Sequence, residues 1–155
     1  MAELNRVVAH YEDGTLLKGT TQDFNVGKPS FHLLPINGSP NVEVHCRALK
    51  AVFFVMDFTG GAHSPASRGF APAGAGNPGG KKIAALFHDG ELMCGYTLSY
   101  VPGREGFFMF PADPNSNNLR IFVVNALVEE VCVGAEADAL AERVAAERKR
   151  AAIKV

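Results

Sequence analysis

The chain has 155 residues and a formal net charge of −1, and 47% of its residues are apolar. It has no apolar run near the ~20 residues that a membrane helix needs and no signal peptide at its start, so we expect a soluble, cytoplasmic protein with no membrane span. Lys and Arg do not gather on one stretch of the first 135 residues, which argues against a nucleic-acid-binding surface.

The chain begins with a pattern that predicts a β-hairpin. Apolar residues alternate over residues 6–12, and Asp13-Gly14 then predicts a tight turn with positive φ at both positions. The chain returns antiparallel in a second strand that contains Gly19. A glycine inside a strand suits a sharp bend, and we therefore expect the strongly coiled sheet of a small barrel.

The same pattern occurs a second time, 76 positions later. Residues 6–35 align with residues 82–111, and nine positions are identical. In both copies a third strand, at 30–34 and 106–110, ends at a proline, and a fourth and a fifth strand follow. This duplication predicts two copies of one small β unit. The identical pairs are Ala9/Ala85, Asp13/Asp89, Gly14/Gly90, Leu16/Leu92, Gly19/Gly95, Thr21/Thr97, Gly27/Gly103, Phe31/Phe107 and Pro35/Pro111.

Two segments stand out at the end of the first copy and directly after it. Residues 51–58, AVFFVMDF, are apolar at almost every position, so we expect them to be buried on both faces, between the two barrels or at a subunit contact. Residues 59–80 contain seven glycines and three prolines without any period, which is typical of a flexible linker.

The last twenty residues predict a helix. After Gly134 the sequence is rich in alanine, with acidic residues early and basic residues late, as a helix dipole favours. We expect this helix to pack on a barrel, although it could also pair with another helix or stay largely solvated. Its thin apolar stripe consists of Ala137, Leu140, Ala141 and Val144.

No motif for catalysis, metal binding or phosphate binding stands out. The three cysteines share no C-x-x-C spacing and are expected to be small buried apolar residues, and the five histidines form no i,i+4 pair. G-x-S-x-G and G-x-x-x-x-G-K-[ST] motifs are absent. We therefore expect no catalytic residues, no metal site and no cofactor.

One polar loop is the best candidate for recognition. Residues 111–118, PADPNSNN, belong to the connection between the third and fourth strands of the second copy, which is three residues longer than its counterpart at 36–41. Turn residues explain part of this composition, but loops on a rigid scaffold are also where binding sites arise. The contact residues that this hypothesis names for a ligand or partner are Asp113, Asn117, Asn118 and Arg120.

Several segments resemble an uncharacterised bacterial family that carries this unit singly or in tandem. The resemblance covers residues 6–133, and its specific parts read KGTTQDF, LKAVFFVMDF and PADPNSNN. The family implies no assigned activity. The order of strands and turns is also distantly similar to the Sm-like and PilZ-like small barrels.

These two distant resemblances imply functions whose motifs are absent here. Sm-like RNA binders carry an Arg-Gly step before the last strand, but these positions read Arg47-Ala48 and Asn125-Ala126. PilZ-like receptors of cyclic dinucleotides carry an Arg-x-x-x-Arg motif and a later Asp/Asn-x-Ser-x-x-Gly motif, and this chain has neither. The resemblance therefore implies the scaffold and no ligand.

The sequence predicts an all-β protein of two tandem small barrels, each of about five strands, with a C-terminal helix. The expected function is a non-catalytic binding or adaptor module of the bacterial cytoplasm that contacts an unknown protein partner; a homo-oligomer is also compatible. The alternatives are a degenerate PilZ-like small-ligand receptor and an Sm-like nucleic-acid binder. The expected parts are a first barrel at 1–58, a linker at 59–80, a second barrel at 81–133 and the helix at 134–155.

Overall fold

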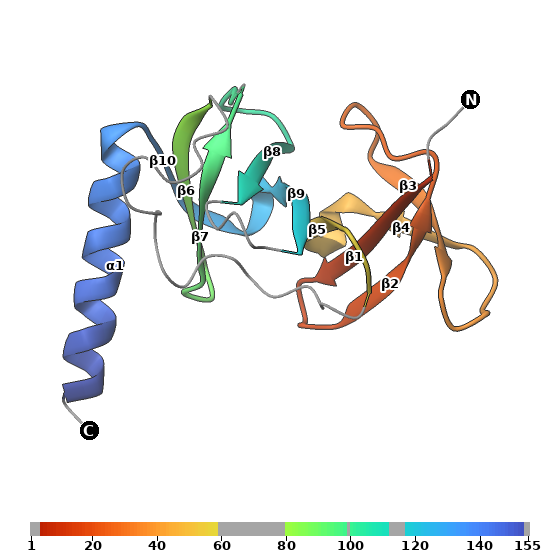
Figure 1. Cartoon of the computed structure of the whole chain (residues 1–155), viewed down its shortest axis with the longest axis horizontal. Coiled ribbons are helices and arrows are strands. Elements are labelled where there is room, and N and C mark those ends of the chain that lie inside the picture. Colours follow the sequence, from red (N-terminus) through yellow and green to blue (C-terminus); the bar gives the residue numbers. More distant parts are fainter. Residues whose placement is uncertain (1–3, 59–79, 99, 112–116, 154–155) are drawn as a thin grey trace. The chain divides into compact units, whose positions relative to one another are not determined.

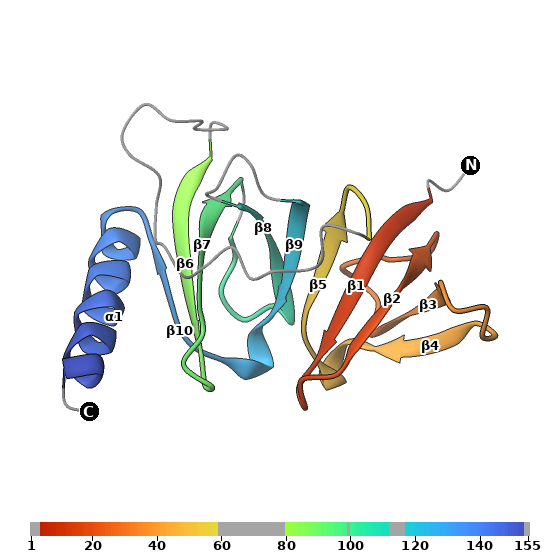
Figure 2. The same ribbon diagram turned by 60° about the horizontal axis from the view of Figure 1, so that its bottom comes forward.

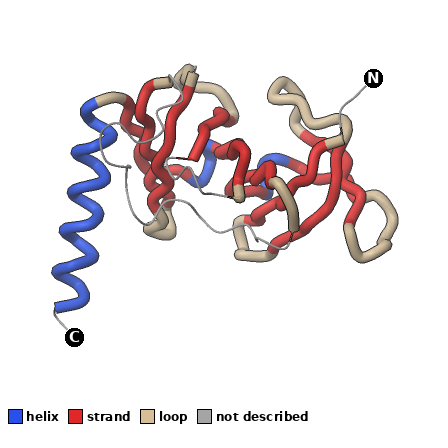
Figure 3. Tube along the Cα trace, in the orientation of Figure 1, coloured by secondary structure: helices blue, strands red, loops and turns tan. Residues whose placement is uncertain are grey.

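The computed structural model describes residues 4–58, 80–98, 100–111 and 117–153. Strands dominate, and one long helix ends the chain (Figure 3). The predicted linker lies almost entirely outside the described residues. The elements of the first copy are β1 (Asn5–Tyr11), β2 (Leu16–Thr21), β3 (Ser30–Pro35), β4 (Val42–His45), the short 3-10 helix η1 (Cys46–Ala48) and β5 (Leu49–Val55).

The second copy has the same succession of elements, followed by the helix. These elements are β6 (Lys81–Phe87), β7 (Leu92–Thr97), β8 (Gly106–Pro111), β9 (Asn118–Val124), the 3-10 helix η3 (Asn125–Leu127), β10 (Val128–Val133) and α1 (Ala135–Ile153). The ten strands follow the order β10-β6-β7-β8-β9-β5-β1-β2-β3-β4 in one sheet that is not closed. Each copy therefore keeps its five strands together in the same order.

The strand register is the same at equivalent positions of the two copies. Val7 lies opposite Gly19 and Phe54, and its counterpart Ile83 lies opposite Gly95 and Val133. Both copies also have an irregularity near the start of the fifth strand, where the register against the first strand shifts. The equal register indicates that the turns and the alternation of apolar residues fix the strand pairing in the same way in both copies.

The hairpin turns differ in one detail from the sequence prediction. Gly14 and Gly90 both have a φ of 91°, but no other residue type has a positive φ in the described part of the chain. The turn has a three-residue loop, since Tyr11 N–H donates to the Thr15 carbonyl over 2.8 Å. The predicted pair of positive φ angles at Asp13-Gly14 is therefore wrong, because a type I turn followed by one left-handed glycine makes this connection.

The glycines inside the second strands allow a close approach of backbones. A Cβ atom at Gly19 would collide with the Leu34 carbonyl oxygen, and one at Gly95 would collide with the Phe110 carbonyl oxygen. The strand that each glycine faces, β3 or β8, is its hydrogen-bonded neighbour. The repeated glycine is thus a requirement of sheet packing in both copies.

The chain divides into two compact units that do not coincide with the sequence copies. Of the described residues, the first unit holds 4–58, 100–108 and 117–127, and the second holds 80–98, 109–111 and 128–153. The first unit therefore contains the first copy together with β9 and η3 of the second.

The additional strand of the first unit pairs with β5 (Figure 2). The antiparallel register of β5 and β9 places Val52 opposite Phe122 and Phe53 opposite Ile121. All seven residues of β5 are buried, and β1 pairs with its other edge. The predicted burial of 51–58 is confirmed for 51–55, but it is wrong for Met56 and Asp57, which are exposed because the strand ends at Val55, and Phe58 is only partly buried.

Five phenylalanine rings form the centre of the first unit. The Phe24 ring lies 5.1 to 5.9 Å, centroid to centroid, from the rings of Phe31, Phe54, Phe108 and Phe122. Most of these contacts are edge-to-face, an arrangement that adds stability beyond the burial of area. Since Phe108 and Phe122 come from the second copy, the core of this unit depends on both copies.

The helix belongs to the second unit and packs there beside β6 and β10 (Figure 1). Ala137, Leu140 and Val144 are buried against a cluster that includes Ala84, Leu92, Cys94 and Tyr96. The Lys82 ammonium binds the Asp138 carboxylate at 3.1 Å, and the Arg148 guanidinium donates to the Gly90 carbonyl over 2.9 Å. The expectation that the helix packs on the β structure is therefore met.

The prediction of a β-rich protein with a C-terminal helix is confirmed. Since the sheet is open, the division into two closed barrels remains a prediction, and so do the domain boundaries. Within the described residues, no helix is both long and apolar enough to cross a membrane.

We predict that Phe53→Ala and Phe54→Ala each lower the free energy of unfolding by about 3 kcal/mol, because each removes a packed ring from a buried strand. Met56→Ala serves as the control, since this side chain is half exposed. Chemical denaturation checks the prediction. Equal stability of all three variants would contradict the burial of β5.

We also predict that Gly19→Ala lowers the free energy of unfolding by about 1–3 kcal/mol, because the new Cβ has to push the backbone of β3 away. Gly27→Ala is the matched control, since a Cβ there would meet only the Asn25 side chain at 3.3 Å. Thermal unfolding of both variants makes the comparison. A Gly27 variant that is the less stable of the two would refute the close-approach argument.

Candidate functional site

The predicted recognition loop is only partly described. Residues 112–116, and with them Asp113, lie outside the described residues. The structure places the other three predicted contact residues at the start of β9, in the first unit.

Asn117 and Asn118 lie where β9 begins to pair with β5. The Asn117 side-chain amide donates to the Asp57 carbonyl over 2.9 Å, and the Asn117 carbonyl accepts from Met56 N–H over 3.0 Å. Asn118 lies opposite Val55 and is 6% exposed. In this structure the two residues fasten the end of β5 to β9.

The Arg120 side chain stacks on aromatic rings. Its guanidinium carbon lies 4.5 Å from the centre of the Phe54 ring and 4.7 Å from that of Phe108. This cation–π geometry stabilises the phenylalanine cluster and uses the faces of the guanidinium, while its edge N–H groups can still donate. The four residues stay a predicted contact set, since the structure describes three of them and no partner.

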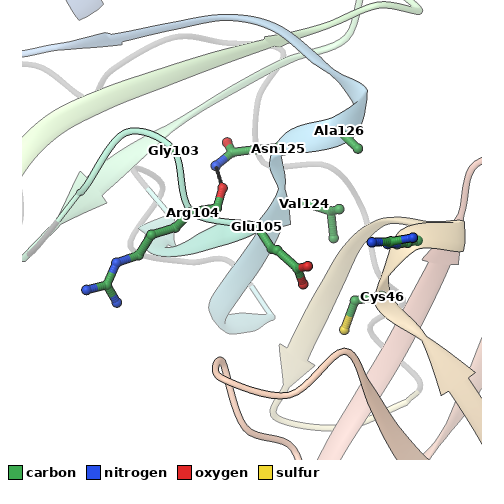
Figure 4. A pocket seen from close by; sticks show the side chains of 8 residues that line it. Cys46, Gly103, Arg104, Glu105, Val124, Asn125 and Ala126 are labelled. Carbon is green, nitrogen blue, oxygen red and sulfur yellow. Dashed lines mark hydrogen bonds between the residues drawn. The ribbon is translucent and has the colours of Figure 1, made fainter.

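A different group of residues forms a cavity of about 220 Å³ in the first unit (Figure 4). We call it the composite pocket, because η1 of the first copy forms one wall, and η3 and the turn before β8 of the second copy form the other. Its lining residues are Cys46, Arg47, Gly103, Arg104, Glu105, Val124, Asn125 and Ala126.

Local hydrogen bonds hold the second wall in place. Asn125 N–H donates to the Glu105 carbonyl over 2.9 Å, and the Asn125 side-chain amide donates to the Arg104 carbonyl over 2.8 Å. Gly103, with a φ of 88°, makes the turn that precedes these residues. The turn and η3 are thus joined by two bonds from one asparagine, and such support is what a precise binding site needs.

The pocket combines an apolar floor with a charged rim. Val124 and Cys46 are only 3% and 6% exposed, whereas Arg47, Arg104 and Glu105 are exposed. In Figure 4 the Glu105 carboxylate extends to the side on which Cys46 lies, and the Arg104 side chain extends away from it. Within the described residues, none of the three charged side chains has an ion-pair partner.

The thiols of the chain are poorly suited to nucleophilic chemistry. Burial raises the pKa of Cys46, and the nearby Glu105 carboxylate raises it further. Burial likewise raises the pKa of Cys94 to about 12. A thiol with a raised pKa holds little of the reactive thiolate at neutral pH. Among the residues that the structure describes, no three His, Cys, Asp or Glu side chains are grouped as metal ligands would be.

A second cavity, of about 330 Å³, lies beside β2 and β3. It contains His32, whose Nδ1 lies 2.8 Å from the Asp23 carboxylate, and the same carboxylate accepts from His32 N–H over 2.9 Å. Both side chains are largely exposed. We interpret this pair as a clamp that holds the loop before β3 against the strand.

The sequence does not reveal the composite pocket. The alignment of the copies pairs Arg47 with Ala126 and Cys46 with Asn125 as members of equivalent 3-10 turns. It gives no sign that these turns meet, because their proximity results from the pairing of β5 with β9. The one feature of the sequence that pointed toward the pocket is that the two turns occupy equivalent positions in the two copies.

No curated protein and no solved structure matches the chain. The model of the Family of unknown function (DUF6982) matches residues 3–135, which is most of the chain, and the chain therefore belongs to this family.

Proposed function

We propose that this protein is a non-catalytic binding module of the bacterial cytoplasm, an adaptor that recognises a protein partner through the composite pocket. The observation that carries this proposal is the pocket's construction from both copies, with an apolar floor and charged side chains that have no ion-pair partner among the described residues. On this proposal the two copies are tandem small barrels, similar in strand order to Sm-like and PilZ-like barrels.

The chemistry of the pocket favours a partner segment with an apolar side chain beside a carboxylate. The floor at Val124 and Cys46 offers an apolar surface, and the Arg47 guanidinium can form a charge-assisted, bidentate bond to a carboxylate. Glu105 disfavours a second negative charge at the floor. This combination suits a short acidic-apolar peptide segment better than a polyanion.

The polar loop of the second copy has a supporting role in this proposal. Asn117 and Asn118 hold the β5–β9 joint, and Arg120 covers the aromatic cluster. Together with Asp113 they could still offer polar contacts to the same partner. The alternatives, a small-ligand receptor and a nucleic-acid binder, would use the two arginines of the pocket for phosphate groups.

A defined probe tests the proposal. We expect the ¹⁵N-labelled protein to bind the peptide acetyl-Ser-Leu-Glu-Leu-Asp with chemical-shift changes at Gly103, Asn125 and Ala126. Arg47→Glu weakens this binding by at least roughly tenfold, because it removes the charge-assisted bond to the carboxylate and puts a like charge in its place. Lys28→Glu is the matched control, since Lys28 is the counterpart of Arg104 in the first copy and does not line the pocket.

The same titration separates the alternatives. Equal weakening by Arg47→Glu and Lys28→Glu would show that the peptide responds only to net charge, which contradicts the pocket. If cyclic dinucleotides or single-stranded RNA bind at these residues and the peptide does not, the receptor or nucleic-acid alternative replaces the adaptor.

A further inference from the structure

Two strands lie at the ends of the sheet. β4 is the fourth strand of the first copy, and β10 is the fifth strand of the second copy. Inside the chain the complementary pair is already joined, since β5, the fifth strand of the first copy, pairs with β9, the fourth strand of the second. Among the residues that the structure describes, the sheet therefore ends in a fourth strand at one end and a fifth strand at the other, the two kinds of strand that pair in its internal joint.

The backbone of β4 has hydrogen-bonding groups that point away from β3. Cys46 N–H donates to the Pro29 carbonyl over 2.9 Å, which fixes the alternation along this antiparallel pair. Residues Val42 and Val44 then face β3 with their N–H and C=O groups, and the groups of Glu43 and His45 point to the open edge.

The same argument applies to β10. Gly134 N–H donates to the Lys82 carbonyl over 2.8 Å, so the backbone groups of Cys132 face β6 and those of Val131 and Val133 point outward. Both valines are half-buried, and α1 covers the face that carries Cys132.

We propose that β4 of one molecule pairs with β10 of a second copy of this chain, in the register of the internal β5–β9 joint. In that joint Val52 lies opposite Phe122. Their counterparts in the repeat are Val131 and Glu43, so Val131 of one molecule lies opposite Glu43 of the next. Two edges that present outward N–H and C=O groups at matching positions are a template for strand addition.

The charges favour β10 over a second β4 as the occupant of the β4 edge. Pairing β4 with itself would bring Glu43 near another Glu43, and like charges across strands are destabilising. In the proposed register Glu129, the counterpart of Lys50, comes beside His45. Since the contact joins two different edges, it continues to further copies as a ring or a chain.

The test uses proline at the outward-facing positions of each edge. Glu43→Pro and Val131→Pro each remove one outward N–H, but they leave the hydrogen bonds to β3 and β6 in place. Sedimentation velocity should show assemblies larger than a monomer for the unsubstituted chain and monomers for either variant alone. A mixture of the two should form a one-to-one complex, because each variant keeps the edge that the other lacks.

Alanine variants and charge variants provide the controls. Glu43→Ala keeps the N–H group and should still assemble. If a proline variant loses its native circular dichroism, Val131→Lys should strengthen assembly and Val131→Glu should weaken it, since residue 131 lies opposite Glu43. An unsubstituted chain that stays monomeric at concentrations on the order of hundreds of micromolar overturns the proposal. The proposal is also overturned if the mixture of the two proline variants forms no complex and one variant alone still dimerises. That result would assign the contact to two identical edges.

Discussion

The pairing of β5 with β9 is the constraint on which the rest of the first unit depends. An apolar strand such as β5 cannot have an open edge or an exposed face in water without risk of aggregation. β1 covers one edge and β9 the other, and all seven residues of β5 are buried. The same pairing brings Phe108 and Phe122 of the second copy to the rings of Phe24 and Phe54.

The composite pocket is a consequence of that joint. η3 follows directly after β9, and η1 comes directly before β5, so antiparallel pairing of these strands brings the two 3-10 turns to the same end. Asn125 then holds the turn before β8 against η3. A duplicated unit thereby acquires a pocket with unlike walls, since equivalent turns carry Cys46-Arg47 on one side and Asn125-Ala126 on the other.

The local features of the fold could be predicted from the sequence, because they have local causes. The turn glycines, the prolines that end β3 and β8, the apolar run at 51–55 and the stripe of α1 all follow from periodicity and backbone preference. The β5–β9 joint could not be predicted from the sequence, because it pairs two sheet edges that no periodicity of the sequence connects. The stacking of Arg120 on two phenyl rings was missed for the same reason, because the rings come from strands of both copies.

Amide hydrogen exchange along β5 tests the central role of this joint most directly. Met56 N–H donates to the Asn117 carbonyl over 3.0 Å, and alternation then directs the N–H groups of Val52 and Phe54 toward β9. We expect these two amides to exchange as slowly as those of Ala51 and Phe53, which face β1. Exchange at Val52 and Phe54 as fast as at the open edge residue Glu43 would contradict the pairing of β5 with β9.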